Sequence, residues 1–288
     1  MPVFIIGNPR SGTSLLRLMI NAHPIISIPP ECGFIIWLKE KYNNLPSNLF
    51  LGRIDEFLED LFKSKKFETW NLDTKQLKNY ILEQKFDTYS NLVSIIYKYY
   101  GLSKNKKVAI WGDKNNYYLN HIVELKQLFP DSFFIHIIRD GRDVACSYKK
   151  LSETKCTSKY APNLPTETSK IADEWKTNIT NINNQFVEFN YEHVIEIRYE
   201  DLVLEPKETL VKLCTFIGVN FCDSMLNYYN KTNDHEPAEF LQWKEKTLMP
   251  PTTSEVGKYT AFMSDDEITI FNEIAYDVLA KYNYYCGK

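Results

Sequence analysis

Residues 7–14, GNPRSGTS, have the composition of a turn that binds an anion. They follow the apolar run 3–6 and precede an apolar helical pattern, so the turn joins a strand to the start of a helix. Backbone amides at such a turn are free to donate to an oxyanion, and Gly12 lets the chain approach it closely. Arg10 adds a charge that does not titrate in proteins. Three hydroxyl donors complete the set: Ser11, Thr13 and Ser14. The pattern predicts an anion site, although a strand–turn–helix of this kind can also be purely structural.

The turn lacks the lysine of an ATP or GTP P-loop, because Thr13 stands in its place. Those enzymes use the lysine, together with Mg²⁺, to neutralise the transferring phosphoryl group. A sulfuryl group carries less charge and can be transferred without a metal. The nearest acidic candidate for a metal ligand is Asp113, but Lys114 beside it favours an anion. No cysteine and histidine set has the spacing of zinc ligands, so we expect no metal site.

A second phosphate-binding candidate is IIRDGRDVACSYKK, residues 137–150. Arg139 ends a predicted strand, Asp140 and Gly141 form a turn, and Ser147 lies within the helix that follows. A strand-end arginine and a helical serine that converge can bind one phosphate. The alternative is a salt bridge between Arg139 and an aspartate of the turn, with Ser147 an ordinary helix residue. By itself this stretch leaves both interpretations open.

Composition indicates an ordinary globular chain of 288 residues with 44% hydrophobic and 25% charged residues. The net charge of −3 gives no reason to expect nucleic acid as a partner. No apolar run approaches the ~18 residues that a membrane span needs. The six cysteines form no C-x-x-C pair, which is typical of reduced thiols and favours the cytoplasm.

The elements predicted around these motifs are those of an α/β protein. Four runs rich in β-branched and aromatic residues read as strands: 3–6, 108–111, 133–138 and 194–199. Helical patterns cover 171–189, 206–217 before Gly218, and the segment after a capping box at Ser264. Amphipathic helices also fill an insertion at about 45–105. Two long irregular stretches, 152–170 and 231–257, read equally well as lids or as surface excursions.

The two anion motifs together resemble the phosphate-binding motifs of the sulfotransferase family, which uses 3′-phosphoadenosine 5′-phosphosulfate (PAPS). The resemblance extends through WGDKNNYY (111–118), IRYEDLVLEP (197–206) and EVGKY (255–259). It is nearest to bacterial sulfotransferases and to the tyrosylprotein sulfotransferase branch. It implies one domain over residues 1–288 with a P-loop-like, three-layer α/β/α fold, a central parallel sheet and a helical insertion. PAPS would lie at the carboxyl ends of the strands.

The resemblance also implies roles for individual residues. The 5′-phosphosulfate would be held by Arg10, Ser11, Gly12, Thr13 and Ser14. The 3′-phosphate would be held by Arg139 and Ser147. Tyr199 would lie beside the cofactor, and Lys258 would close over the nucleotide.

Transfer to a hydroxyl needs a general base. Glu31, in SIPPECGFI, matches the catalytic glutamate of the tyrosylprotein branch, and its apolar neighbours predict a raised pKa through desolvation. A glutamate that only favours a helix start is the alternative. Many cytosolic members use a histidine, so the base is Glu31 or one of five histidines: His23, His121, His136, His193 and His235. Lys114 would stabilise the leaving group, unless it is a solvated lysine at a strand end, and Arg10 would assist electrostatically.

These observations predict a PAPS-dependent sulfotransferase that acts on a hydroxyl, with an amine as second choice, and that releases adenosine 3′,5′-bisphosphate (PAP). The alternatives are a P-loop kinase of nucleotides or small molecules and a nucleotide-binding module without catalysis. The acceptor is a small molecule, a carbohydrate or a peptide, enclosed by the insertion and the two long stretches. We expect a monomer or homodimer.

Overall fold

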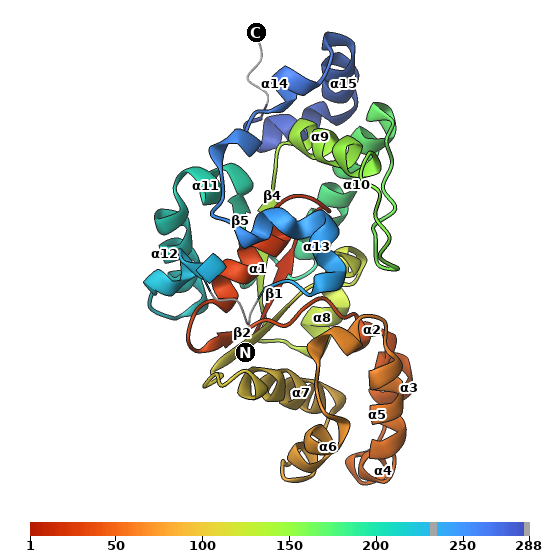
Figure 1. The fold of residues 1–288 in the computed structure, drawn as a ribbon. Coiled ribbons are helices and arrows are strands. Elements are labelled where there is room, and N and C mark those ends of the chain that lie inside the picture. Colours follow the sequence, from red (N-terminus) through yellow and green to blue (C-terminus); the bar gives the residue numbers. More distant parts are fainter. Residues whose placement is uncertain (231–234, 285–288) are drawn as a thin grey trace.

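A sheet of five parallel strands forms the centre of the molecule (Figure 1), seen in a computed structural model that describes residues 1–230 and 235–284. Its strands are β1 (Pro2–Ile6), β2 (Ile26–Ser27), β3 (Ile110–Lys114), β4 (Phe133–Ile138) and β5 (Val194–Arg198), in the order β2-β3-β1-β4-β5. The central β1 is buried along its whole length, as a parallel strand covered on both faces must be. The predicted parallel α/β sheet is confirmed.

One strand prediction needs correction, and one strand was missed. The strand expected at 108–111 runs from Ile110 to Lys114, so the acidic and basic residues of WGDKNN lie inside β3. The two-residue β2 was not predicted, because an element this short has no periodicity to recognise.

The two faces of β1 pack against different layers. Val3 and Ile5 pack with α1 (Thr13–Asn21), and Phe4 and Ile6 face the opposite layer. The first layer also contains α11 (Tyr199–Leu204), α12 (Pro206–Ile217), η3 (Asp223–Met225) and η4 (Tyr228–Asn230). The second contains α8 (Ile122–Leu128) and the end of α10 (Thr168–Val187). The arrangement is the predicted three-layer α/β/α fold.

The insertion is helical, as predicted, but its helices begin at Phe34 rather than at about residue 45; it lies at one end of the molecule in Figure 1. It comprises α2 (Phe34–Trp37), α3 (Lys39–Tyr42), α4 (Ser47–Gly52), α5 (Ile54–Lys63), η1 (Phe67–Trp70), α6 (Thr74–Leu82) and α7 (Tyr89–Ser103). Aromatic rings fill its interior and continue to the sheet, where Tyr97 of α7 stacks on Trp111 of β3 with ring centroids 4.4 Å apart. The short η2 (Asn116–Asn120) links β3 to α8.

The other end of the molecule is built from α9 (Gly141–Ser152), α10, α14 (Tyr259–Phe262) and α15 (Asp265–Lys281), as Figure 1 shows. The predicted capping box at Ser264 is present at the start of α15. The stretch 231–257, expected to be irregular, contains α13 (Ala238–Lys244), η6 (Glu245–Leu248) and η7 (Thr253–Glu255); residues 231–234 lie outside the described part. No helix of the described residues has the length and apolarity to cross a membrane.

Candidate active site

The turn between β1 and α1 has a constrained backbone, with little room around Gly12. Gly12 has φ 91°, and a Cβ atom there would lie 2.4 Å from the ring of Tyr199. Arg10 also takes a left-handed conformation, with φ 67°, which non-glycine residues rarely adopt. Thr13 begins α1, and Ser14 follows in its first turn. The buried hydroxyl of Ser11 has no hydrogen-bond partner among the described residues, as expected of a donor meant for a ligand.

The two predicted anion motifs meet in space. The Nε of Arg10 donates to Ser147 Oγ over 3.1 Å, and the Nη1 of Arg139 donates to the carbonyl of Arg10 over 3.2 Å. The guanidinium of Arg139 also stacks on Tyr199, 4.4 Å from the ring centroid. Burial, and secondly the charge of Arg139, lower the pKa of Arg10. An anion between the two arginines would offset both the desolvation of Arg10 and its repulsion by Arg139.

The alternative interpretation of RDGRD, a salt bridge between Arg139 and the turn, does not hold. Asp140 caps α9 and binds Arg142, whose Nη2 lies 2.7 Å from Asp140 Oδ2. Asp143 accepts from the backbone amides of Gly257 and Tyr259. With the aspartates engaged elsewhere, Arg139 faces the turn of residues 7–14.

The late segment that contains Lys258 reaches the same place. Lys258 Nζ binds Glu255 Oε2 over 2.9 Å, and Arg139 Nη2 lies 3.8 Å from the same oxygen. Lys246 binds the other oxygen of Glu255. Burial opposes ionisation of Glu255, but the neighbouring lysines outweigh it and hold its pKa at about 2. The pKa of Lys258 is lowered by burial and by Arg139.

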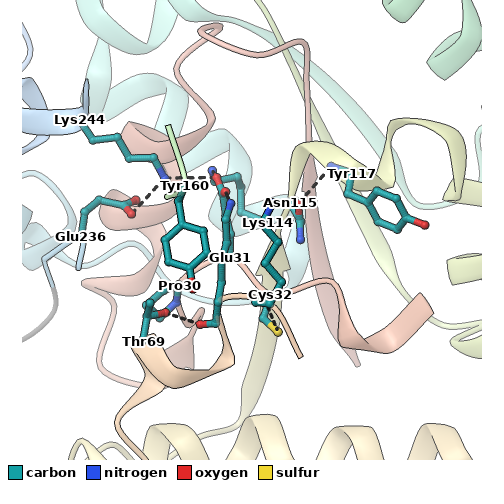
Figure 2. Close-up of polar contacts among 12 residues, drawn as sticks. Pro30, Glu31, Cys32, Thr69, Lys114, Asn115, Tyr117, Tyr160, Glu236 and Lys244 are labelled. Atoms are coloured by element: carbon teal, nitrogen blue, oxygen red, sulfur yellow. Dashed lines mark hydrogen bonds and ion pairs between the residues drawn. The ribbon is translucent and has the colours of Figure 1, made fainter. Parts of the chain in front are cut away.

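The predicted base lies in a cluster of three lysines. Glu31 Oε2 binds Lys66 Nζ over 2.6 Å, and Oε1 binds both Lys114 and Lys244, the latter over 3.2 Å. Figure 2 shows the Glu31 carboxylate between Lys114 and Lys244, with Glu236 beside Lys244. Only 8% of Glu31 is exposed.

The pKa predicted for Glu31 from its apolar neighbours was wrong in direction. Burial alone would raise the pKa, but Lys114, Lys244 and Lys66 outweigh burial and hold it well below its usual value. Conversely, burial lowers the pKa of Lys114 to about 8, against the attraction of Glu31. Lys114 is 1% exposed, so it is not a solvated lysine at a strand end.

The five histidines make their contacts elsewhere in the described structure. His23 and His235 contact backbone carbonyls of Asn220 and Tyr229. His121 contacts Glu124 and the ring of Tyr117, His136 contacts Glu196 and the ring of Phe186, and His193 contacts the ring of Phe133. None of these partners belongs to the Glu31 cluster, so the geometry favours Glu31 as the base.

The two long stretches meet beside Glu31. Tyr160 packs on Phe240 of α13 with ring centroids 5.7 Å apart, and its hydroxyl binds Glu68 of η1. The backbone amide of Thr157 donates to Gln242 over 2.9 Å. The stretch 152–170 therefore spans α13 and the insertion beside the site, which favours a covering role over a surface excursion.

Sequence reasoning missed four charged residues of the site: Arg17, Lys66, Glu236 and Lys244. Arg17 left a readable signal, because it is a charge inside the apolar pattern LLRLMI. Lys66, Glu236 and Lys244 left none, since each lies in an ordinary polar context and reaches the site only through the fold. Among the described residues no group of three or more histidine, cysteine, aspartate or glutamate side chains could hold a metal.

Comparisons with known proteins agree with this geometry. A profile described as "Sulfotransferase family" matches residues 2–223. Protein-tyrosine sulfotransferase 2 of Gallus gallus is 23% identical over 285 residues, covering 98% of this chain and 69% of that protein. The Drosophila melanogaster protein-tyrosine sulfotransferase is 24% identical over 283 residues, covering 95% of this chain and 50% of its own length. This chain thus spans from half to about two thirds of these relatives.

Two solved structures share the fold. The sulfotransferase domain from the curacin biosynthetic pathway has a TM-score of 0.62 at 23% identity, covering 96% of this chain and 98% of that one. The sulfotransferase domain from the Synechococcus PCC 7002 olefin synthase has a TM-score of 0.60 at 20% identity, covering 95% and 94%. The prediction of a sulfotransferase is confirmed, and the chain belongs to the sulfotransferase family.

Proposed function

We propose that this enzyme transfers the sulfuryl group of PAPS to a hydroxyl group that reaches Glu31, with Arg10, Lys114 and Glu31 acting on the reacting atoms. One observation carries the proposal. The carbonyl of Trp243 accepts from Arg10 Nη1 over 3.0 Å, and the next residue, Lys244, contacts Glu31. The donor-binding turn and the base are therefore joined by two adjacent residues, which is the proximity that a direct transfer needs.

The residues of the first turn fit the 5′-phosphosulfate. Gly12 leaves the space for a close approach, and Ser11 has an unused buried hydroxyl. Arg139 keeps an unpartnered, buried Nε in the described structure, which suits an additional anionic partner. Arg139 and Ser147 would bind the 3′-phosphate, Tyr199 would support Arg139, and Lys258 would cover the nucleotide.

In the reaction, the acceptor oxygen attacks sulfur while the bond between sulfur and the bridging oxygen of PAPS breaks. The electron pair of that bond stays on the 5′-phosphate, which leaves as part of PAP. Lys114 would stabilise the charge that develops on the bridging oxygen, and Arg10 would do so from the turn. The acceptor proton passes to Glu31.

The protonation state of Glu31 favours an acceptor whose hydroxyl group has a low pKa. Because its pKa is low, the carboxylate is ionised at neutral pH and ready to accept, but it is a weak base. Proton transfer from a phenol, with a pKa near 10, is easier for such a base than transfer from an alkyl alcohol. A phenolic hydroxyl, on a small molecule or on a tyrosine of a peptide, is thus the best-matched acceptor. The names of the protein-tyrosine sulfotransferases it resembles are in line with this class.

The test combines labelled PAPS with a panel of phenols, tyrosine peptides, alkyl alcohols and amines. Glu31→Gln should lower kcat on the order of 10²–10⁴ while PAP still binds. Glu40→Gln, an exposed glutamate of α3, is the matched control. Undiminished activity of Glu31→Gln would exclude Glu31 as the base. If PAP does not bind at micromolar concentration, and ATP with Mg²⁺ stabilises the protein instead, the donor is wrong and a kinase is favoured.

A further inference from the structure

Four buried charged side chains form a chain from α1 to the base. Arg17 Nη2 lies 3.1 Å from Glu236 Oε1, Glu236 Oε2 lies 3.1 Å from Lys244 Nζ, and Lys244 Nζ lies 3.2 Å from Glu31 Oε1. The exposed fractions of these side chains are 1% for Arg17, 1% for Glu236, 7% for Lys244 and 11% for Glu31. Arg17 also donates to the carbonyl of Ile28. The chain ties the helix that starts at the anion-binding turn to the C-terminal segment and to Glu31.

Stability alone does not explain such a chain. Removing each ion from water costs several kcal/mol, and apolar side chains of similar volume are often as stabilising as a buried ion pair. Burial disfavours the charge of Glu236, yet Arg17 and Lys244 hold its pKa at about 2, so it stays ionised at any working pH. This fixed anion binds Arg17 through Oε1, and its other oxygen, Oε2, holds the ammonium of Lys244 in place.

The position of the Lys244 ammonium indicates what this residue does in the site. Lys244 and Lys114 bind the same oxygen of Glu31, although one carboxylate oxygen is shared poorly by two like charges. Within residues 1–230 and 235–284, the other oxygen of Glu31 binds Lys66 alone. The residue before Lys244 contacts Arg10, so Lys244 lies at the junction of the donor turn and the base.

We infer that Lys244 is a further catalytic residue and that Glu236 positions it. This inference rests on the proposed function. When PAPS and the acceptor bind, the ammonium of Lys244 turns from Glu31 to the non-bridging sulfuryl oxygens, and it stays on them as the sulfuryl group passes from the bridging oxygen to the acceptor oxygen. No proton leaves Lys244. Its departure raises the basicity of Glu31 at the step in which Glu31 takes the acceptor proton, and Arg17 and Glu236 keep Lys244 within reach.

The experiment compares Lys244→Met with Lys66→Met, since each variant removes one lysine from Glu31. Neither strands a charge, because Glu31 keeps two lysines and Glu236 keeps Arg17. We expect Lys244→Met to lower kcat on the order of 10² and Lys66→Met to lower it far less. Lys244→Arg should restore part of the loss. Glu236→Gln should lower kcat about tenfold or more without weakening PAP binding.

The pH profiles separate catalysis from simple tuning of Glu31. The profile of kcat/KM reports the free enzyme, and that of kcat reports the bound complex. Lys66→Met should move the acid limb of both profiles to higher pH. Lys244→Met should move only the limb of kcat/KM, because Lys244 has left Glu31 in the bound complex.

Two outcomes would overturn the role of Lys244 while the sulfotransferase function stands. One is an equal loss of kcat in the two lysine variants, and the other is an acid limb of kcat that moves equally in both. Failure of the unaltered protein to bind PAP or to transfer sulfate would overturn the proposed function itself. Thermal unfolding identifies a variant that is not folded. If Glu236→Gln is such a variant, the combined change Arg17→Met, Glu236→Leu and Lys244→Met removes all three linked charges, and its kcat should match that of Lys244→Met alone.

Discussion

The buried carboxyl group of Asp113, next to Lys114 on β3, leads to a prediction about how the free energy of unfolding depends on pH. Its Oδ2 accepts hydrogen bonds from the hydroxyls of Tyr97 over 2.5 Å and Tyr118 over 2.6 Å. Its Oδ1 is buried and has no partner among the described residues. Burial outweighs the two hydrogen bonds and raises the pKa of Asp113 to about 7, from a usual value of 3.8.

The sign of the effect follows from the raised pKa. Below about pH 4 the carboxyl is protonated in both states and ionisation costs nothing. Between about pH 4 and 7 the unfolded chain loses this proton and the folded chain keeps it, so the free energy of unfolding falls as the pH rises. A shift of about three pKa units, at about 1.4 kcal/mol each, amounts to about 4 kcal/mol above pH 7.

Asp113→Asn removes this term and keeps an acceptor for the two tyrosines. Urea unfolding of both proteins at about pH 5 and about pH 8 isolates the effect, because other titrating groups cancel in the comparison. Relative to the unaltered protein, the variant should gain about 3 kcal/mol between the two pH values, which corresponds to about 1 M in urea midpoint. Asp87→Asn, an exposed aspartate, should show no such gain. If the difference for Asp113→Asn is the same at both pH values, Asp113 is ionised in the folded protein at pH 5 and the reasoning is refuted.

Four further outcomes are expected. Arg139→Ala should weaken PAP binding about 10- to 100-fold and AMP binding much less, since charge-assisted hydrogen bonds contribute about 1.5–3 kcal/mol; equal losses measured by calorimetry would contradict its role at the 3′-phosphate. Glu255→Gln removes a carboxylate 3.8 Å from Arg139 and should tighten PAP binding several-fold, with AMP as the control ligand. Gly12→Ala should abolish PAP binding in a thermal-shift assay, because its Cβ would lie 2.4 Å from Tyr199 and φ is 91°. Tyr160→Ala should raise the KM of the acceptor and leave the Kd of PAP unchanged; a change in Kd alone would place Tyr160 on the nucleotide side.

The sequence was sufficient for the parts of this protein that are local. GNPRSGTS and RDGRDVACS each lie within one strand–turn–helix, so residue type and spacing predicted the turn, the donor groups and the parallel sheet around them. The same holds for the capping box at Ser264, which depends on residues three apart. Sequence alone could not decide whether Arg139 pairs with the turn, because Asp140 and Asp143 find their partners in contacts specific to the fold.

Only the tertiary structure decided the environment of Glu31. Its three lysines are Lys66 just before η1, Lys114 at the end of β3 and Lys244 at the end of α13. They are far apart in the chain, and no pattern near Glu31 in the sequence predicts that they contact it. The local apolar context predicted a raised pKa, and the assembled site lowers it. The reason is physical: desolvation depends on burial, which neighbouring residues suggest, whereas the opposing Coulomb attraction depends on charges that only the fold brings within 2.6 to 3.2 Å.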